Sequence, residues 1–262
     1  MSSPTLVILG TGYTGRVLFR QARAEGRIVF AASRAPETHL LDIPPEQRLR
    51  FDLDHDETWS AIPAQADVVW TFPAVPVDTV CAFGEQIAPR LRRLVVLGAT
   101  SAYDGSPQAV RGEPVDETAP VDRTIARVQG EESLRERYGA LVLRVAGIYG
   151  PGRNPLDWIR QGRVGYSHRF VNLIHVEDLA AIILQTLEDG VPGDTYNVSD
   201  GTPRRWSEIM DAAAARWGTG KPLPADPTAG KRISNRKLLA ELGYTLRYPD
   251  LFAALEELER GT

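Results

Sequence analysis

A short apolar run that leads directly into closely spaced glycines constrains this chain more than any other feature. Leu6 to Leu9 are four consecutive apolar residues, which is typical of a parallel strand covered on both faces. Gly10, Gly12 and Gly15 follow in the pattern G-x-G-x-x-G. Residues 16–24 then place apolar side chains at helical spacing. The segment is therefore predicted to be a strand, a tight turn and a helix.

These glycines have the positions that dinucleotide binding requires in such a unit. The first permits the tight turn, the second lets the backbone approach a pyrophosphate, and the third lets the helix pack closely on the strand. The helix N-terminus adds N–H groups and the positive end of the helix dipole. The alternative is a glycine-rich turn without a ligand. We predict that the whole loop binds the dinucleotide, namely Gly10, Thr11, Gly12, Tyr13, Thr14 and Gly15.

The end of the next predicted strand indicates which dinucleotide is preferred. Ile28 to Ala32 is apolar and is followed by Ser33 and Arg34. NAD-binding units place an acidic residue here, which accepts hydrogen bonds from the ribose hydroxyls. In this chain no carboxylate is present to repel a 2′-phosphate, and a guanidinium is present to pair with one. The sequence therefore favours NADP over NAD, the alternative being that Arg34 is a solvated loop charge.

Composition excludes several classes of protein. The chain has 262 residues and a net charge of −4, which gives no indication of binding to nucleic acid or to an anionic membrane. The single cysteine, Cys81, excludes an internal disulfide, fits a reducing compartment and is interpreted as a core thiol. The four histidines lack metal-ligand spacing, so no metal site is expected. Without a long apolar run or a signal peptide, a cytoplasmic protein is expected.

Strands and helices alternate through the first half of the chain, which predicts a parallel sheet with helical crossovers. The fold class is therefore α/β, a Rossmann-type doubly wound sheet. Further strands are predicted near residues 49–53, 66–72, 94–97 and 141–145, and a helix from Val121 to Tyr138.

The pattern changes after Gly150, where helices predominate. We predict a dinucleotide-binding domain at residues 1–150, with residues 172–198 returning to the sheet. Residues 151–262 would form a smaller, mostly helical substrate-binding part. The cleft between a sheet edge and such a part is where ligands bind in these folds.

The chain resembles the extended and atypical short-chain dehydrogenases/reductases, the NAD(P)-dependent epimerase/dehydratase group. The resemblance runs nearly end to end, and part of the chain looks like an atypical, poorly characterised subgroup of this family. The motifs that carry it are Gly10 to Gly15, Asp52-Leu53, Ser101-Ala-Tyr103, Arg144 to Gly152, Asn172 to Ala180 and Gly230 to Asn235.

The resemblance implies further cofactor contacts. It places Asp52 and Leu53 beside the adenine, and Phe72 and Pro73 under the cofactor ribose. Near the nicotinamide it places Gly147, Ile148 and Tyr149, and it gives Arg127 a hydrogen bond to the nicotinamide ribose. For Asp52 the alternative is a cap at the end of a strand.

The chain departs from the family pattern at the catalytic positions. Relatives that transfer a hydride use a Ser or Thr together with Tyr-x-x-x-Lys, in which the Tyr moves the proton. Here the Tyr and Lys places fall on Arg123 and Arg127, and the Ser/Thr place falls on Ala99. Arginine is a poor proton shuttle because its pKa exceeds about 12. Arg123 is interpreted as a solvated helix charge.

The remaining candidates for catalysis lie just after the predicted strand at 94–97. Tyr103 is the one phenol near the expected cleft, and its alternative role is packing. Thr100 and Ser101 are the adjacent hydroxyls.

Candidate substrate-binding residues follow from the second part of the chain. Tyr149, Arg153, Asn172 and Arg232 are polar or basic residues in a region where relatives hold a diphosphate, and surface or packing roles are the alternatives. His175 precedes two acidic residues at a predicted helix start, so a capping hydrogen bond is preferred to catalysis.

Two functions remain open from the sequence. The first is an NADP-dependent oxidoreductase of the epimerase/dehydratase type, acting on a small polar or anionic substrate with a nonstandard catalytic set. The second is a non-catalytic NADP(H)-binding sensor or scaffold. Ordinary nucleotide-sugar epimerisation is disfavoured by the missing Tyr-x-x-x-Lys pair. A small-molecule substrate is expected, without nucleic acid or membrane partners, in a monomer or homodimer.

Overall fold

The computed structural model describes residues 4–219 and 230–261, and it divides into two compact units. Among the described residues, the first unit consists of the chain up to Ala99 together with Arg123–Arg144 and Leu179–Tyr196. The second unit consists of Thr100–Asp122, Val145–Asp178 and the chain from Asn197 onward. Each unit therefore contains segments that are distant in sequence.

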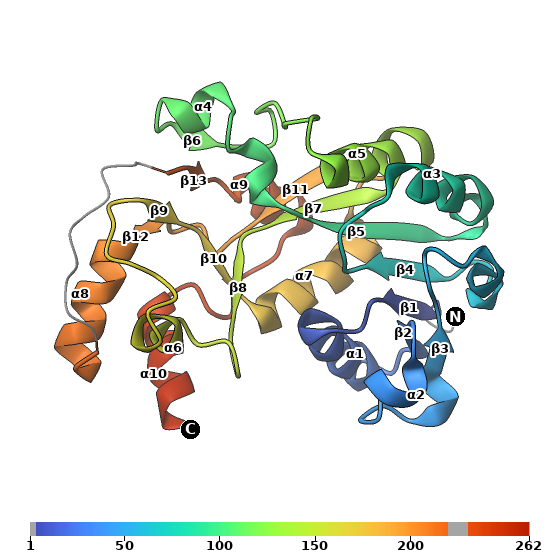
Figure 1. Cartoon of the computed structure of the whole chain (residues 1–262), viewed down its shortest axis with the longest axis horizontal. Coiled ribbons are helices and arrows are strands. Elements are labelled where there is room, and N and C mark those ends of the chain that lie inside the picture. Colours follow the sequence, from blue (N-terminus) through green and yellow to red (C-terminus); the bar gives the residue numbers. More distant parts are fainter. Residues whose placement is uncertain (1–3, 220–229, 262) are drawn as a thin grey trace. The chain divides into compact units, whose positions relative to one another are not determined.

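A seven-stranded sheet forms the framework of the fold (Figure 1). Its order is β11-β7-β5-β4-β1-β2-β3. Leu6 of β1 pairs with both Val29 of β2 and Asp67 of β4, so β1 runs parallel to its two neighbours. This arrangement confirms the predicted doubly wound α/β fold. The strands are β1 (Leu6–Leu9), β2 (Val29–Ser33), β3 (Arg48–Arg50), β4 (Asp67–Trp70), β5 (Arg93–Ala99), β7 (Leu141–Val145) and β11 (Thr195–Val198).

Helices connect these strands and cover the sheet, because parallel neighbours need a crossover. In Figure 1, α3 and α5 lie along one side of the sheet and α1 lies on the other. The core of the first unit includes edge-to-face contacts of Phe83 with Trp59 and Trp70, at 5.4 and 5.1 Å between ring centroids. The helices are α1 (Tyr13–Ala24), α2 (Pro36–His39), α3 (Val77–Gln86), α5 (Ala126–Tyr138) and α7 (Val176–Asp189), with short 3-10 turns at Pro45–Gln47, Asp56–Ala61 and Ala88–Arg90.

Helix α5 begins at Ala126, so the predicted start at Val121 is wrong. The preceding backbone makes other hydrogen bonds, since the N–H of Asp122 donates to the carbonyl of Ala102. The carbonyl of Arg123 accepts from the side chain of Gln129, at 2.8 Å. The end at Tyr138 is as predicted, because Gly139 adopts the left-handed conformation that terminates the helix.

The second unit combines helices with three two-stranded pairings. Its core surrounds Tyr149, Leu156, Ile209 and Leu255. Its elements are a 3-10 turn (Thr100–Tyr103), α4 (Pro107–Val110), β6 (Pro114–Val115), β8 (Gly147–Tyr149), α6 (Pro155–Arg160), β9 (Phe170–Val171), β10 (Leu173–His175), β12 (Arg204–Arg205), α8 (Trp206–Trp217), β13 (Arg232–Ile233), α9 (Arg236–Leu242) and α10 (Leu251–Arg260).

The division differs from the predicted boundary at residue 150. Segment Thr100–Asp122 belongs to the second unit, because its strand β6 pairs in parallel with β13. Val115 of β6 is buried together with Tyr103, Ala119 and Ile233. Of the segment 172–198, residues 179–196 belong to the sheet-containing unit.

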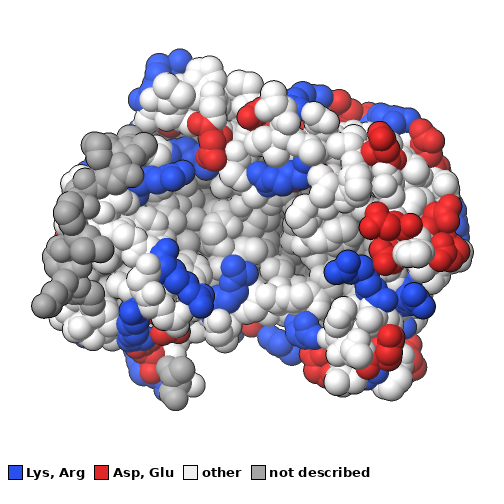
Figure 2. All heavy atoms as spheres, viewed as in Figure 1, with Lys and Arg blue, Asp and Glu red and all other residues white. Residues whose placement is uncertain are grey.

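The described surface shows neither a membrane span nor a metal cluster. No helix within residues 4–219 and 230–261 is long and apolar enough to cross a membrane. In the same ranges, no group of three His, Cys, Asp or Glu side chains is placed to hold a metal ion. Lys or Arg and Asp or Glu side chains are both exposed on the face drawn in Figure 2.

Candidate functional site

The glycine turn between β1 and α1 has the geometry that the sequence predicts. Gly10 has a φ of +83°, and a Cβ on it would lie 2.7 Å from a ring carbon of Phe72. Gly15 packs on β1, because a Cβ there would lie 3.2 Å from the side chain of Ile8. These two glycines are therefore required by the chain itself.

Gly12 is different, because the protein does not fill the space beside it. Its φ is −87°, and a Cβ on it would meet only the carbonyl oxygen of Gly10, at 4.0 Å. Gly12 is also the N-cap of α1, and no side chain caps this helix end. The first N–H groups of a helix need external acceptors, and an anion provides them. The structure thus leaves room and hydrogen-bond donors for a phosphate group at Gly12.

A cavity of about 500 Å³ opens at this turn, entirely within the first unit. Of the predicted cofactor residues, eight line it: Gly10, Thr11, Gly12, Ser33, Arg34, Asp52, Leu53 and Phe72. The sequence analysis missed five others, namely Arg16, His39, Phe51, Asp54 and Val75. The predicted residues Tyr13, Thr14, Gly15, Pro73, Arg127, Gly147 and Ile148 are not among its lining.

Local hydrogen bonds hold the walls of the cavity. The Thr11 hydroxyl donates to the carbonyls of Ile8 and Ala32, which ties the glycine turn to β1 and β2. On the opposite wall, the carbonyl of Asp52 accepts from the indole N–H of Trp59, at 3.0 Å. The guanidinium of Arg34 makes no hydrogen bond or ion pair among the described residues and is exposed to the cavity. It is therefore available to an anionic ligand.

The chain is similar to known proteins along nearly its whole length. No family model matches the sequence. Protein YeeZ of Escherichia coli K12 is 26% identical over 270 residues, which cover 94% of this chain and 96% of YeeZ. A Methylobacillus flagellatus structure with the provisional name NAD-dependent epimerase/dehydratase is 27% identical, with a TM-score of 0.81 over 100% of this chain and 99% of that one. The predicted resemblance is confirmed. The chain is similar to the NAD(P)-dependent epimerase/dehydratase group of the short-chain dehydrogenases/reductases.

A more distant structure shows the same fold. The human epimerase family protein SDR39U1, determined with NADPH, is 20% identical and has a TM-score of 0.74, covering 99% of this chain and 100% of that one.

The helix that carries Tyr-x-x-x-Lys in typical short-chain dehydrogenases/reductases carries ion pairs here. Arg123, at the Tyr place, lies before α5 and contacts Glu132 and Glu136, with its side chain 55% exposed. This arrangement agrees with its interpretation as a solvated charge. Arg127, at the Lys place, lies on α5 within the first unit. Its predicted hydrogen bond to the nicotinamide ribose stays a prediction.

A buried charge cluster on the same helix was missed by the sequence analysis. Arg144 of β7 is fully buried and contacts Glu131, and it donates to Glu132 at 2.7 Å. Burial raises the pKa of Glu131, although Arg144 and Arg127 favour its charged form. A Cβ on Gly98 would lie 2.7 Å from a Glu131 carboxylate oxygen, so the glycine in β5 makes room for the cluster.

The candidate catalytic residues lie in the second unit. Tyr103 is only 1% exposed and packs against Val115, Ala119 and Ile233. Thr100 is also buried, whereas Ser101 is half-buried. The burial of Tyr103 favours the packing role that the sequence left open. A catalytic role for these three residues stays a prediction.

Two of the four candidate substrate residues of the second unit are hydrogen-bonded to its own backbone. Asn172 donates to the carbonyl of Lys231 and accepts from the N–H of Ile233, at 3.0 and 2.8 Å. Arg232 donates to the carbonyl of Gly112. Tyr149 is fully buried, and its hydroxyl has no hydrogen-bond partner among the described residues. Arg153 is exposed in the loop after β8.

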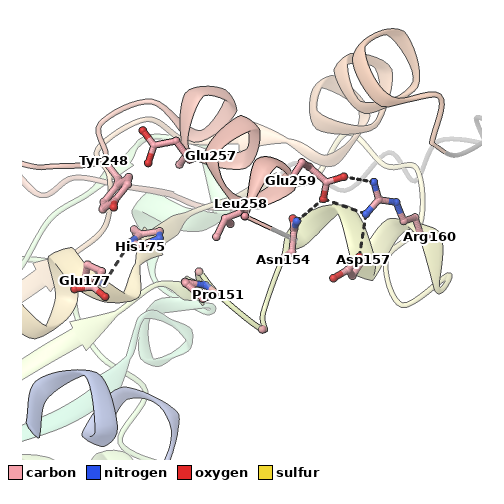
Figure 3. Close-up of a pocket in the computed structure, with 14 residues that line it drawn as sticks. Pro151, Asn154, Asp157, Arg160, His175, Glu177, Tyr248, Glu257, Leu258 and Glu259 are labelled. Atoms are coloured by element: carbon pink, nitrogen blue, oxygen red, sulfur yellow. Dashed lines mark hydrogen bonds and ion pairs between the residues drawn. The ribbon is translucent and has the colours of Figure 1, made fainter. Parts of the chain in front are cut away.

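A second cavity, of about 660 Å³, lies within the second unit (Figure 3). His175 lines it and is stacked on Tyr248, with ring centroids 3.8 Å apart. Its Nδ1 accepts from the N–H of Glu177, which is the capping hydrogen bond that the sequence predicts. Burial lowers the pKa of His175 despite the nearby carboxylates of Asp178 and Glu177, so its neutral form is favoured.

The charged lining of this second cavity is mainly acidic. Arg160 is the one guanidinium among its lining residues, and it donates to Asp157 and Glu259. The carboxylates are those of Asp157, Glu177, Glu257 and Glu259. With His175 neutral, four negative charges and one positive charge give a net charge of −3. Such a lining disfavours an anion.

Proposed function

We propose that this chain is an NADP(H)-binding, oxidoreductase-like protein of the epimerase/dehydratase type that acts on a small polar substrate. The observation that carries the proposal is the space beside Gly12. Nothing in the protein requires a glycine there by contact, whereas a pyrophosphate lying over the N-terminus of α1 would. The cavity is continuous from this turn to Ser33 and Arg34, where the ribose end of a dinucleotide would lie.

The preference for NADP is supported by the residues at the end of β2. Ser33 and Arg34 line the cavity, and no carboxylate occupies the place that accepts a ribose 2′-hydroxyl in NAD-binding units. The unpaired guanidinium of Arg34 would form charge-assisted hydrogen bonds with a 2′-phosphate. SDR39U1 provides a parallel, because its structure holds NADPH.

A bound nicotinamide would supply or accept a hydride, and the chain must provide the accompanying proton transfer. Arginines at the usual Tyr and Lys places do not do this at neutral pH. Ser101, half-buried beside Tyr103, is the better placed of the predicted residues to meet a substrate oxygen. Proton transfer through Tyr103 would require its contacts with Val115 and Ile233 to open.

The same observations support a second function, binding of NADP(H) without turnover. Tyr103 is enclosed by apolar side chains, and Arg123 is held by two glutamates. A sensor or scaffold would need only the cofactor cavity.

The substrate of an active enzyme is proposed to be uncharged or cationic wherever it contacts the second cavity. This narrows the polar-or-anionic class expected from the sequence, because the lining of that cavity has a net charge of −3.

Calorimetric titration of NADPH and NADH tests cofactor binding. Gly12→Ala places a methyl group where the pyrophosphate would lie, so NADPH affinity should fall at least about tenfold, which corresponds to about 1.4 kcal/mol. Gly165→Ala is the matched control, since a Cβ there likewise has open space around it, with nothing within 4 Å. Arg34→Ala should weaken NADPH and leave NADH unchanged.

Two results would contradict the proposal. Binding of neither nucleotide by the unaltered protein would exclude cofactor binding, and equal loss in both glycine variants would remove the role of Gly12. Oxidation of NADPH with a panel of carbonyl compounds then separates enzyme from sensor. Tight binding without turnover across the panel would favour the sensor.

A further inference from the structure

His39 lies in the nucleotide cavity at a position that the glycine and arginine motifs do not reveal. It is the last residue of α2, and its Nδ1 is 2.8 Å from the hydroxyl oxygen of Ser33. The same hydroxyl oxygen accepts from the N–H of Ala35, at 3.2 Å. The Ser33 hydroxyl is thus held from two sides, and the direction of its proton depends on His39.

Arg16 fixes His39 in this position. Its guanidinium donates to the carbonyl of His39 at 2.6 Å and to the carbonyl of Thr11 in the glycine turn at 2.8 Å. It also forms a bidentate pair with Asp42, at 2.8 and 3.1 Å. Arg16 therefore connects α1, the glycine turn and the end of α2. These contacts use four of the five guanidinium N–H groups, so Arg16 holds His39 in place.

The proton on Nδ1 of His39 decides what Ser33 offers to a ligand. A neutral imidazole with an unprotonated Nδ1 accepts the Ser33 proton, so the serine oxygen presents only lone pairs to the cavity. A protonated imidazole donates from Nδ1 to that oxygen, and the Ser33 proton is then free to turn outward. A ribose 2′-hydroxyl can pair with Ser33 in either state, because it both donates and accepts, whereas a phosphate oxygen accepts and is matched only by the second state.

We propose that His39 is a specificity-determining residue that directs the Ser33 hydroxyl toward the 2′-phosphate of NADP. The inference rests on the proposed function, because it assumes that the cavity binds the adenosine end of a dinucleotide. It adds a residue and a pH dependence to that function. Protonation of His39 strengthens NADPH binding and does not strengthen NADH binding.

The charges around His39 come from several elements and include both signs. Arg16 on α1 is paired with Asp42, which follows α2. Arg34 lies in the loop after β2, and Asp52 and Asp54 line the cavity after β3. Arg50 of β3 is in register with Ser33. A 2′-phosphate would bring its negative charge to the same place, so binding and protonation of His39 should reinforce each other.

Calorimetric titration of NADPH and NADH at about pH 6 and about pH 8 tests the inference. His39→Gln removes the imidazole, and the exposed His39 side chain makes its replacement compatible with folding. We expect His39→Gln to weaken NADPH binding about tenfold at the lower pH, which is the strength of one charge-assisted hydrogen bond, with little change at the higher pH. NADH affinity should not change at either pH. His55→Gln, an exposed histidine outside the cavity lining, should behave as the unaltered protein.

A double-mutant cycle tests whether His39 acts through Ser33. Ser33→Ala should weaken NADPH binding at the lower pH, and His39→Gln should add little to it, because both remove the same hydrogen bond. Comparison with His55→Gln also corrects for titration of the 2′-phosphate itself. Unchanged NADPH binding in His39→Gln, or additive losses in the double variant, would overturn this inference alone. Failure of the unaltered protein to bind either nucleotide would instead overturn the proposed function on which it rests.

Discussion

At the residue scale, burial decides which polar side chains of this chain are free to act. Asn172 and Arg232 carry polar groups that the sequence assigns to a substrate, but both donate to backbone carbonyls of their own unit. Arg34 and His39 are instead exposed in the cavity at the glycine turn. Residue type therefore indicates which chemistry a side chain could perform, and its local hydrogen bonds decide whether its polar groups are available to a ligand.

Asp200 provides a pH-dependent test at the residue scale. It is 5% exposed and accepts from the N–H of Thr202 and from Arg204, yet burial raises its pKa to about 6. The Asp200 carboxyl therefore stays protonated up to a higher pH in the folded state than in the unfolded chain. Its stabilising contribution is complete below about pH 4 and is lost as pH rises through about 6.

Asp200→Asn removes this titration. The free energy of unfolding of the unaltered protein, relative to the variant, should fall by about 3 kcal/mol between about pH 4 and about pH 7. Urea unfolding at a series of pH values measures this difference. Parallel pH profiles for the two proteins would show that Asp200 does not retain its proton.

At the element scale, α5 and β7 are joined by charge in the interior. Arg144 on β7 is enclosed between Glu131 and Glu132 on α5, whereas Arg123 pairs with Glu132 and Glu136 near the surface. The two arginines therefore provide a matched comparison of a buried and an exposed ion pair.

Replacing Arg144 should destabilise the protein far more than replacing Arg123. Arg144→Met leaves two buried carboxylates without their buried partner, so we expect a loss of about 3–5 kcal/mol. Arg123→Met removes exposed contacts and should cost at most about 1 kcal/mol. Urea unfolding measures both. Equal losses of stability in the two variants would refute a structural role for the buried cluster. Adding Glu131→Gln to Arg144→Met should recover part of the lost stability.

Local patterns predict some of these elements and miss others. The strand-turn-helix unit at Gly10 to Gly15 is predictable, because apolar runs and helical spacing report directly on neighbouring residues. The start of α5 is not, since it depends on a hydrogen bond between Asp122 and Ala102. The contacts of Arg144 with the two glutamates require α5 to pack on β7, which local periodicity does not reveal. Ser33 and Arg34 were predicted to bind the cofactor from their place after a strand, whereas the contact of His39 with Ser33 spans the short helix α2, which the sequence does not indicate.

At the scale of the whole molecule, each unit is assembled from distant parts of the chain. Segment Thr100–Asp122 joins the second unit through the pairing of β6 with β13. Ile233 of β13 is 1% exposed and contributes to the cluster that encloses Tyr103. A substitution near the end of the sequence should therefore change the stability of the segment near its middle.

Ile233→Ala tests this coupling. The loss of a buried side chain should lower the free energy of unfolding by roughly 2–5 kcal/mol. Hydrogen exchange should accelerate in residues 100–122 more than in the strands of the first unit. Ile62→Ala, a buried change in the first unit, should give the reverse distribution. Faster exchange confined to β13 would show that Thr100–Asp122 is stabilised independently.

The aromatic wall of the cavity at the glycine turn also gives the protein an intrinsic fluorescence signal. Phe72 lines the cavity and lies 4.7 Å, between ring centroids, from the buried Trp70. Trp59 donates to the carbonyl of Asp52, another residue of the lining. Both indoles belong to the first unit, whereas Trp158, Trp206 and Trp217 belong to the second. A nucleotide that displaces Phe72 or Asp52 should therefore alter the emission of Trp70 and Trp59, so occupancy becomes visible as fluorescence without an attached dye.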